Sequence, residues 1–518
     1  MKTHRRWCTV LLLLLAPLLL EAPPAAARQA DVAALDAYIA RARQDWQVPG
    51  LAVAIVKDGR TVLARGYGER HMSERGAVDE HTLFAIASNS KAFTSALLAM
   101  LVDEGALSWD DRVRDHLPWF QLYDPYVSSQ MRIRDLLSHR SGLGTFSGDL
   151  LWYGTPYSAE EVVRRARHLP PADAFRASYG YTNLMFIAAG EVIHAVTGQP
   201  WPEAVRTRIL DPLGMARTVT STDDLRGRQN VAQPHGLWDG QLVPFPWQNW
   251  DAMAAAGGII ASVSEMAEWL KTQLARGASP AGDTLWTERQ SWTMWEVHTP
   301  LAVSAATQRL YPSTHFRGYG LGWSLNDYLG RKLVSHGGGY DGMYSRVVLV
   351  PEEGLGMVIL TNSMTGISTA IANRIVDAYL GGAERDWSTL LLDREREATA
   401  AEAARRAKVI ERTVAGTAPS LALEAYAGTY GGAMYGDATV ALEDGALVLR
   451  ILPNPELVAD LRHLQFDTFV IEWRRPWPWF GAGVAQFILD PAGQVREMRL
   501  DVPNQDLWFH ELEMTRRR

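Results

Sequence analysis

The chain has 518 residues, of which 47% are hydrophobic and 21% charged, and its formal net charge at pH 7 is −7. This composition is ordinary for a globular protein of two or three domains, and it excludes collagen-like, disordered and coiled-coil classes. Nucleic-acid binding needs a basic patch, and nothing in the net negative charge favours it, so no nucleic-acid partner is expected.

Residues 1–27 have the pattern of a secretory signal peptide. A basic start (Lys2, Arg5 and Arg6) precedes an apolar run over 7–20, and Ala25-Ala-Ala27 resembles a cleavage site. A membrane anchor is the alternative, but the run is short for a membrane span and a proline interrupts it. We expect export to the periplasm or medium with cleavage near Ala27, by either the general or the twin-arginine route.

The single cysteine, Cys8, lies inside this signal peptide. The mature chain would therefore have no disulfide, no thiolate metal site and no cysteine nucleophile. No paired histidine spacing suggests zinc either, so neither a metal nor another cofactor is expected.

The first elements of the mature chain are a helix and a hairpin. Residues 31–45 have helical periodicity, and strand-like runs at 51–56 and 61–65 flank the turn signal Asp58-Gly59.

The next stretch contains a candidate nucleophile. Ser88 precedes Lys91 by three residues, at the start of an apolar helical segment over 92–101. Residues three apart lie on one face of a helix, and a desolvated lysine can lose its proton and activate a serine. A Ser-x-x-Lys spacing also arises by chance. Here, however, only one of the six lysines follows a serine at this spacing, and arginine supplies most of the positive charge.

The region from 159 to 215 is predicted to be mostly helical. Within it, Ser178-Tyr-Gly-Tyr-Thr-Asn-Leu184 opens an apolar helix over 184–196. Tyr181 and Asn183 at this helix start can face the Ser88–Lys91 pair. Alternatively, Thr182 or Asn183 caps the helix and the tyrosines pack in the core. A glycine-containing tract at 254–262 precedes a further helix over 264–276.

From 318 to 362 the pattern changes to strands. Runs at 318–324, 332–335, 345–350 and 356–361 precede a helix over 366–380. Early and late strands around a helical middle predict an α+β fold: one antiparallel sheet flanked by helices, with an all-α subdomain.

His336-Gly-Gly-Gly339 closes the second of these late strands. Glycines weaken a strand, and they are tolerated where another group approaches the backbone closely. The bare N–H groups suit an oxyanion, whereas the alternative is an ordinary glycine turn beside a surface histidine. If His336 lines a cleft, its imidazolium is expected to hold a substrate carboxylate at mildly acidic pH.

The C-terminal part is predicted as a helical connector over 384–420 and a separate β domain over 421–518, after a hydrolase-like unit over 28–383. Period-two runs at 438–442, 446–450, 469–473, 484–489 and 495–500 indicate a small β-barrel.

Three motifs, Ser88-Asn-Ser-Lys91, Tyr181-Thr-Asn183 and His336-Gly-Gly338, occur in this order and once each. They resemble the active-site elements of the penicillin-recognising serine hydrolases, most closely the branch of class C β-lactamases. The resemblance covers about residues 30–380, and supporting stretches lie at 136–142 and 255–258. The C-terminal domain is similar to the lipocalin-like domain of some peptidases and esterases of this family.

The resemblance implies roles for these residues. Ser88 is the acylated nucleophile, Lys91 its base and Tyr181 the proton shuttle, while Asn183 orients the substrate. The N–H groups of Ser88 and Gly339 form the oxyanion hole, and Gly338 belongs to the same substrate- and oxyanion-binding motif. His336 departs from the lysine usual in β-lactamases, which weakens the expectation of penicillin as substrate.

The sequence therefore predicts an exported, metal-independent serine hydrolase that acts through an acyl-enzyme on amide or ester bonds of small peptides or acyl compounds. A D-amino-acid-type peptidase and a carboxylesterase stay open as alternatives, and an idle binding or scaffold protein is the rival from another class. The oligomeric state cannot be predicted.

Overall fold

The structure is a computed structural model, and it describes residues 30–238, 240–411 and 413–517. The predicted signal peptide over 1–27 lies outside the described residues. Among the described residues, no helix combines the length and the apolar character needed to cross a membrane.

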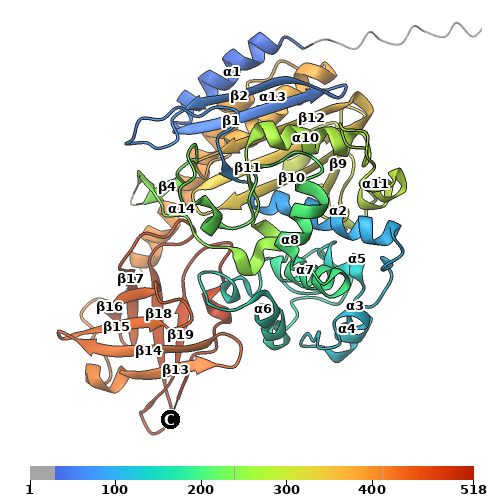
Figure 1. The fold of residues 1–518 in the computed structure, drawn as a ribbon. Coiled ribbons are helices and arrows are strands. Elements are labelled where there is room, and N and C mark those ends of the chain that lie inside the picture. The colour runs from blue at the N-terminus through green and yellow to red at the C-terminus, as the bar shows by residue number, and fades with distance from the viewer. Residues whose placement is uncertain (1–29, 239, 412, 518) are drawn as a thin grey trace, which may run out of the picture.

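The N-terminal unit is built on one antiparallel sheet of eight strands (Figure 1). Their order is β2 (Arg60–Gly68), β1 (Gly50–Lys57), β12 (Leu355–Thr361), β11 (Met343–Val350), β10 (Arg331–Tyr340), β9 (Ser324–Tyr328), β8 (Arg317–Tyr319) and β7 (Thr299–Leu301). Early and late segments pair directly, since Leu51 of β1 is opposite Thr361 of β12. The predicted α+β fold is confirmed.

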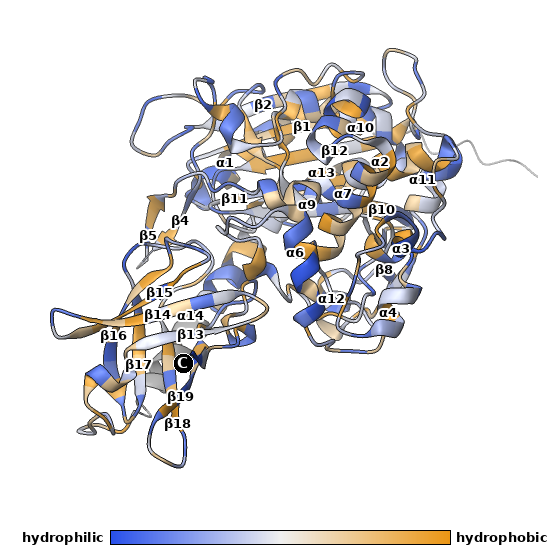
Figure 2. Ribbon diagram, turned by 60° about the horizontal axis from the view of Figure 1, so that its bottom comes forward, coloured by the Kyte–Doolittle hydropathy of each residue, from blue (hydrophilic) through white to orange (hydrophobic). Residues whose placement is uncertain are grey.

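Strand β1 shows why this sheet forms a core. All but the last of its residues are buried, and alternate side chains enter two different clusters, as the period of a strand requires. Leu51, Val53 and Ile55 face α1 (Val32–Asp45) and α13 (Ile367–Leu380). Ala52, Ala54 and Val56 face the other side, where α10 (Val263–Leu274) packs. Figure 2 shows the apolar β1 and β12 between these helices.

The helical subdomain lies beside the sheet and is centred on α7 (Asn183–Thr197) and α2 (Ser90–Asp103). The shorter helices here and around the sheet are α3 (Val113–His116), α4 (Pro125–Gln130), α5 (Ile133–Leu136), α6 (Ala159–Arg165), α8 (Trp201–Val205), α9 (Ala254–Gly257), α11 (Glu288–Met294) and α12 (Ala305–Leu310). The Ser158 hydroxyl caps α6 by accepting from Glu161 N at 3.2 Å.

The prediction that residues 318–324 form one strand is wrong. Strand β8 ends at Tyr319 and β9 begins at Ser324. Gly322 between them has φ 77°, in the left-handed region, so the chain turns there. Gly322 also packs against α2, because a Cβ at this position would lie 3.0 Å from Lys91 O.

The C-terminal unit is a closed barrel of eight strands (Figure 1). The strands are β13 (Gly428–Gly432), β14 (Gly436–Glu443), β15 (Ala446–Ile451), β16 (Val458–Gln465), β17 (Thr468–Trp473), β18 (Gly483–Leu489), β19 (Val495–Asp501) and β20 (Thr515–Arg516). The barrel prediction is confirmed, although β13, β16 and β20 were missed. Glycines in β13 and polar residues in β16 hide the period-two pattern.

Helix α14 (Trp387–Glu411) joins the two units. Its first residue is part of the hydrolase-like core: Trp387 is 1% exposed and donates to Asp377 Oδ2 at 2.6 Å. The connector predicted from residue 384 is therefore packed into the hydrolase-like core at its start. The exact division at residues 383 and 420 stays a prediction.

The barrel also contacts the hydrolase-like unit directly. Asn454 Nδ2 donates to Tyr153 O at 3.0 Å, and the Tyr157 hydroxyl donates to Tyr435 O at 2.6 Å. One hydrophobic cluster runs through both units, with the rings of Tyr153 and Trp477 5.9 Å apart. The barrel is thus held against the helical subdomain by packing as well as by α14.

Candidate active site

Ser88 lies in a short 3₁₀ turn (Ala87–Asn89) that leads into α2. Ala87 has φ 47°, which is uncommon for a residue other than glycine and bends the backbone sharply before the serine. Two hydroxyls fix α2 against the 254–261 tract: Ser90 Oγ accepts from Ile259 N at 3.1 Å, and Thr94 Oγ1 donates to Ala255 O at 2.6 Å. The turn therefore has a rigid support.

Lys91 faces Ser88 from the first turn of α2. Its Nζ lies 3.0 Å from Ser88 Oγ, 2.7 Å from Asn183 Oδ1 and 2.9 Å from Ala256 O. A neutral amine has two N–H groups and one lone pair, which match two acceptors and one hydroxyl donor. This environment suits a lysine that takes the proton of Ser88.

Burial lowers the pKa of Lys91 to about 7, and the nearby Asp149 opposes this shift. The side chain is fully buried, so water does not stabilise the ammonium form. Near neutral pH a large fraction of Lys91 is therefore unprotonated and can act as a base.

Asp149 is a residue that the sequence analysis missed. Its Oδ2 accepts from Asn183 Nδ2 at 2.6 Å, which fixes the amide so that Oδ1 faces Lys91. Burial raises the pKa of Asp149 to about 8. A carboxyl group in its neutral form at pH 7 adds little negative charge beside Lys91, so it does not keep the lysine protonated.

Tyr181 precedes α7 and faces the same serine. Burial raises the pKa of Tyr181 well above its usual value, and its interaction with Ser88 opposes the shift. Lys91 Nζ lies 4.9 Å from the centre of the Tyr181 ring. Because the phenol stays protonated, it can donate a proton but is a poor base, and the general base is better assigned to Lys91.

His139 supports this tyrosine. Its ring centre lies 4.2 Å from that of Tyr181, and its Nδ1 accepts from Thr182 N at 3.1 Å. His139 belongs to the family-like stretch 136–142, but no sequence pattern indicated that it lies in the site.

The glycine run lies on β10, beside the Ser88 turn. A Cβ at Gly338 would lie 2.2 Å from Ile86 O and 3.0 Å from Ser88 N. No side chain fits at this distance, so glycine is required for the strand to approach the turn. The backbone of β10 therefore runs next to the N–H of Ser88, where an oxyanion would be bound.

His336 is in the site, but the expectation of a conditional charge is wrong. Its Nε2 lies 2.8 Å from the Tyr319 hydroxyl, and its Nδ1 lies 2.6 Å from the Gly337 carbonyl. Burial lowers the pKa of His336 to about 3, and the nearby Lys91 lowers it further. The imidazole is therefore neutral at mildly acidic pH and cannot hold a carboxylate as an imidazolium.

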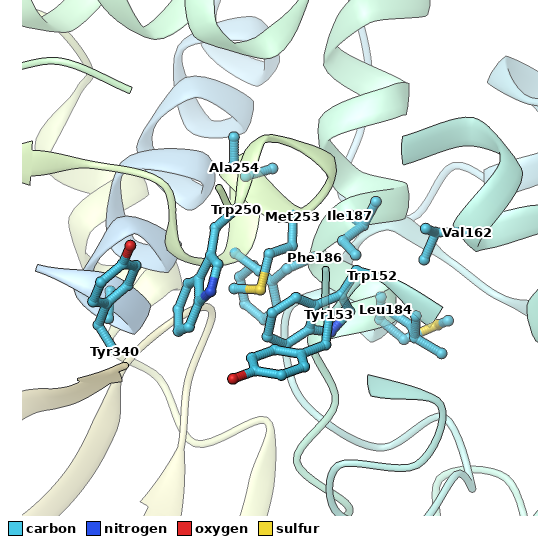
Figure 3. Close-up of a cluster of buried hydrophobic side chains, with 14 of the residues drawn as sticks. Trp152, Tyr153, Val162, Leu184, Phe186, Ile187, Trp250, Met253, Ala254 and Tyr340 are labelled. Atoms are coloured by element: carbon cyan, nitrogen blue, oxygen red, sulfur yellow. The ribbon is translucent and has the colours of Figure 1, made fainter. Parts of the chain in front are cut away.

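These groups open into a cleft of about 420 Å³ lined by Ser88, Tyr181, Asn183 and His336. Aromatic residues form its walls, and Figure 3 shows Trp152, Tyr153 and Trp250 gathered beside Met253. The barrel also contributes to the lining through Trp479, Gln505, Asp506 and Leu507. A Cβ at Gly339 would lie 3.0 Å from the Trp479 ring, so this barrel residue touches the oxyanion strand. No sequence motif indicated these contributions.

The site thus combines a serine hydroxyl, a buried amine, a protonated phenol and a strand edge without side chains. These are the groups that acyl transfer requires. Among the described residues, no group of histidines and carboxylates is placed to hold a metal ion.

Comparison with known proteins agrees with this geometry. The family described as Beta-lactamase matches residues 35–381. The chain belongs to this family. Its barrel region, residues 412–516, matches a domain of unknown function (DUF3471). This member of the beta-lactamase family is a serine hydrolase, like relatives that are named hydrolases and amidohydrolases.

Two curated relatives illustrate the family. Unguisins hydrolase ungD' of Aspergillus campestris is 30% identical over 424 residues, covering 77% of this chain and 76% of the relative. Penicillin-binding protein 4 of Amycolatopsis lactamdurans is 28% identical over 354 residues, covering 65% of this chain and 87% of the relative.

Two solved structures share the fold. The octameric penicillin-binding protein homologue from Pyrococcus abyssi has a TM-score of 0.62 at 23% identity and covers 92% of this chain and 98% of its own. A D-stereospecific amidohydrolase from Streptomyces sp. has a TM-score of 0.54 at 23% identity and covers 68% of this chain and all of its own.

Proposed function

We propose that this member of the beta-lactamase family hydrolyses amide or ester bonds of small peptides or acyl compounds through an acyl-enzyme on Ser88. The observation that carries the proposal is the 3.0 Å contact between Ser88 Oγ and Lys91 Nζ, in a site where burial lowers the pKa of Lys91 to about 7. An unprotonated amine at this distance is the activated-nucleophile arrangement.

The proposed reaction begins when Ser88 Oγ attacks the carbonyl carbon and its proton moves to Lys91 Nζ. The N–H groups of Ser88 and Gly339 bind the oxyanion, for which each donor contributes about 3 kcal/mol. Tyr181 passes a proton to the leaving amine or alcohol as the carbon–heteroatom bond breaks. Water then attacks the ester on Ser88, and the acid leaves.

Amide substrates are supported by the similarity to a D-stereospecific amidohydrolase. A carboxylesterase of the same mechanism is the second candidate. It is supported by the neutral His336 and by the aromatic walls of the cleft, which suit uncharged acyl groups.

Intact-mass spectrometry after exposure to esters, D-aminoacyl amides and β-lactams tests the proposal. We expect one acyl group on the wild type and none on Ser88→Ala. Ser129→Ala, at a half-buried serine of α4 (Pro125–Gln130) that does not line the cleft, is the matched control and should label like the wild type. Absence of labelling with every compound, or labelling that persists in Ser88→Ala, contradicts the proposal and favours a scaffold role.

We also propose export after cleavage near Ala27, which rests on the basic start and the apolar run of residues 1–27. Amino-terminal sequencing of protein from the periplasm or medium should begin near Arg28. Recovery of the intact N-terminus in a membrane fraction contradicts this proposal.

A further inference from the structure

A loop of the barrel extends a carboxylate into the active-site cleft. This loop lies between β19 and the C-terminal strand β20, and its residues Gln505, Asp506 and Leu507 line the cleft with Ser88. The loop is rigid because the Asn504 amide bonds its backbone: Oδ1 accepts from Asp506 N at 3.0 Å and from Leu507 N at 2.6 Å. Nδ2 donates to Val502 O at 2.8 Å. Asp506 is therefore held in place at the cleft.

The Asp506 carboxylate has no partner within the part of the chain that the structure describes. Its backbone N–H is bonded, yet neither side-chain oxygen accepts a hydrogen bond or forms an ion pair. Burial alone raises the pKa of this group to about 6. Asp506 is half-buried, so its carboxylate is reachable from the cleft and can pair with a cationic group that enters it.

The rest of the lining leaves Asp506 as the one group that is charged near neutral pH. The other carboxyl among the described lining residues, Asp149, is mostly neutral at pH 7 because burial raises its pKa to about 8. Neither lysine nor arginine is among the described residues that line the cleft, and Arg346 faces a neighbouring hollow behind Gly337. No lysine or arginine among the described lining residues therefore neutralises the negative charge of Asp506.

The walls of the cleft add a second kind of attraction. Phe146, Trp152, Trp250, Tyr344 and Trp479 line it together with Asp506. Aromatic faces attract ammonium groups through their negative π surface, and a carboxylate beside them supplies the hydrogen-bond acceptor. Aromatic walls beside a carboxylate that has no partner in the described structure suit an alkylammonium group.

We propose that Asp506 of the barrel binds a protonated primary amine of the substrate, so that the barrel selects amine-bearing peptides or aminoacyl compounds for the Ser88 centre. This inference rests on the proposed function, because it assumes that the cleft holds the substrate. It gives the C-terminal domain a direct part in specificity. Free α-ammonium groups and lysine-like side chains share this chemistry, and the experiment separates them.

The test uses the full-length enzyme and a neutral reporter, p-nitrophenyl acetate. Phenylalaninamide, N-acetyl-lysinamide and N-acetyl-phenylalaninamide, each in D and L forms, compete with it; they carry an α-ammonium, a side-chain ammonium and no charge. We expect an inhibition constant at least tenfold lower for one of the ammonium compounds than for the neutral one. In Asp506→Asn this ratio should fall to about one, and in Asp506→Glu it should partly return.

Asp501→Asn is the matched control, because Asp501 is an exposed carboxylate at the end of β19 that does not line the cleft. It should keep the wild-type ratio. Equal inhibition by charged and neutral compounds in the wild type, or a ratio unchanged in Asp506→Asn, overturns the inference even though the ester is hydrolysed. Failure to hydrolyse any ester or amide instead counts against the proposed function, so the two failures are distinguishable.

Discussion

The Tyr319 hydroxyl lies 2.8 Å from Nε2 of His336, and the opposite ring nitrogen lies 2.6 Å from the Gly337 carbonyl. A carbonyl oxygen only accepts, so Nδ1 carries the hydrogen and Nε2 accepts from the tyrosine. This pair fixes a neutral imidazole in the third motif. The third motif of this chain is therefore uncharged.

The first prediction concerns this pair. Tyr319→Phe leaves Nε2 of His336 buried without a donor, which should lower the free energy of unfolding by about 1–3 kcal/mol. Urea denaturation measures the change. Tyr123→Phe is the control, because Tyr123 is 58% exposed and should lose nothing measurable. Equal stability of the two variants contradicts the assigned hydrogen bond.

The second prediction concerns pH. Because Lys91 must be unprotonated to accept the Ser88 proton and its pKa is about 7, kcat/KM for a neutral ester should fall about tenfold per pH unit below pH 7. The rate should level off at higher pH. A pH profile between 5 and 9 measures both limbs.

Substitution identifies the group behind this profile. Lys91→Arg keeps a positive charge that cannot act as a base, so activity should fall by about 10²–10⁴-fold. Lys271→Arg, at a surface lysine paired with Glu268, is the control and should keep the wild-type profile. Retained turnover in Lys91→Arg shows that another group takes the proton.

The third prediction compares two neighbouring glycines of β10. Gly338→Ala places a methyl group 2.2 Å from Ile86 O, so the strand must move away from Ser88 N. Loss of one oxyanion donor costs about 10²–10³ in rate, and acylation should fall by that order. A Cβ at Gly337 meets nothing closer than 3.6 Å, so Gly337→Ala should acylate like the wild type. Rates of phosphonate labelling measure the difference. Equal losses in both variants contradict the close approach of strand and serine.

The fourth prediction concerns the stability cost of Asp506. Its folded pKa of about 6 lies above its ordinary value of 3.8, so the native state binds the proton more tightly than the unfolded state. Stability should therefore fall as pH rises from 3.8 to 6, by about 3 kcal/mol in total. Asp506→Asn should be more stable than the wild type above pH 6 and equal to it below pH 4.

Denaturation at pH 4 and pH 8 measures this difference. Asp501→Asn, at an exposed position, should show none. A destabilised Asp506→Asn at pH 8 means that the carboxylate has a favourable partner in the protein, which also removes the basis for an ammonium site.

The sequence by itself determined the fold class and the nucleophile. The uninterrupted apolar run over 51–56 specifies a strand buried on both sides, because strand side chains point alternately to two faces. The Ser88–Lys91 spacing specifies their contact, because it is local and depends only on the start of α2. The sheet strands and the Ser88–Lys91 contact could be predicted because each depends only on residues close together in the sequence.

Only the tertiary structure determines the protonation states of the groups in the cleft and the residues that form its outer wall. His336 is neutral because Tyr319 and the surrounding core bury it, and no motif records that burial. Asp149 reaches the site through Asn183, from a short 3₁₀ helix (Asp149–Leu151) that no sequence pattern predicted. Asp506 reaches it from a barrel more than 400 residues away from Ser88 in sequence. Contacts between distant segments depend on how the two units pack, and no local pattern of residues predicts that packing.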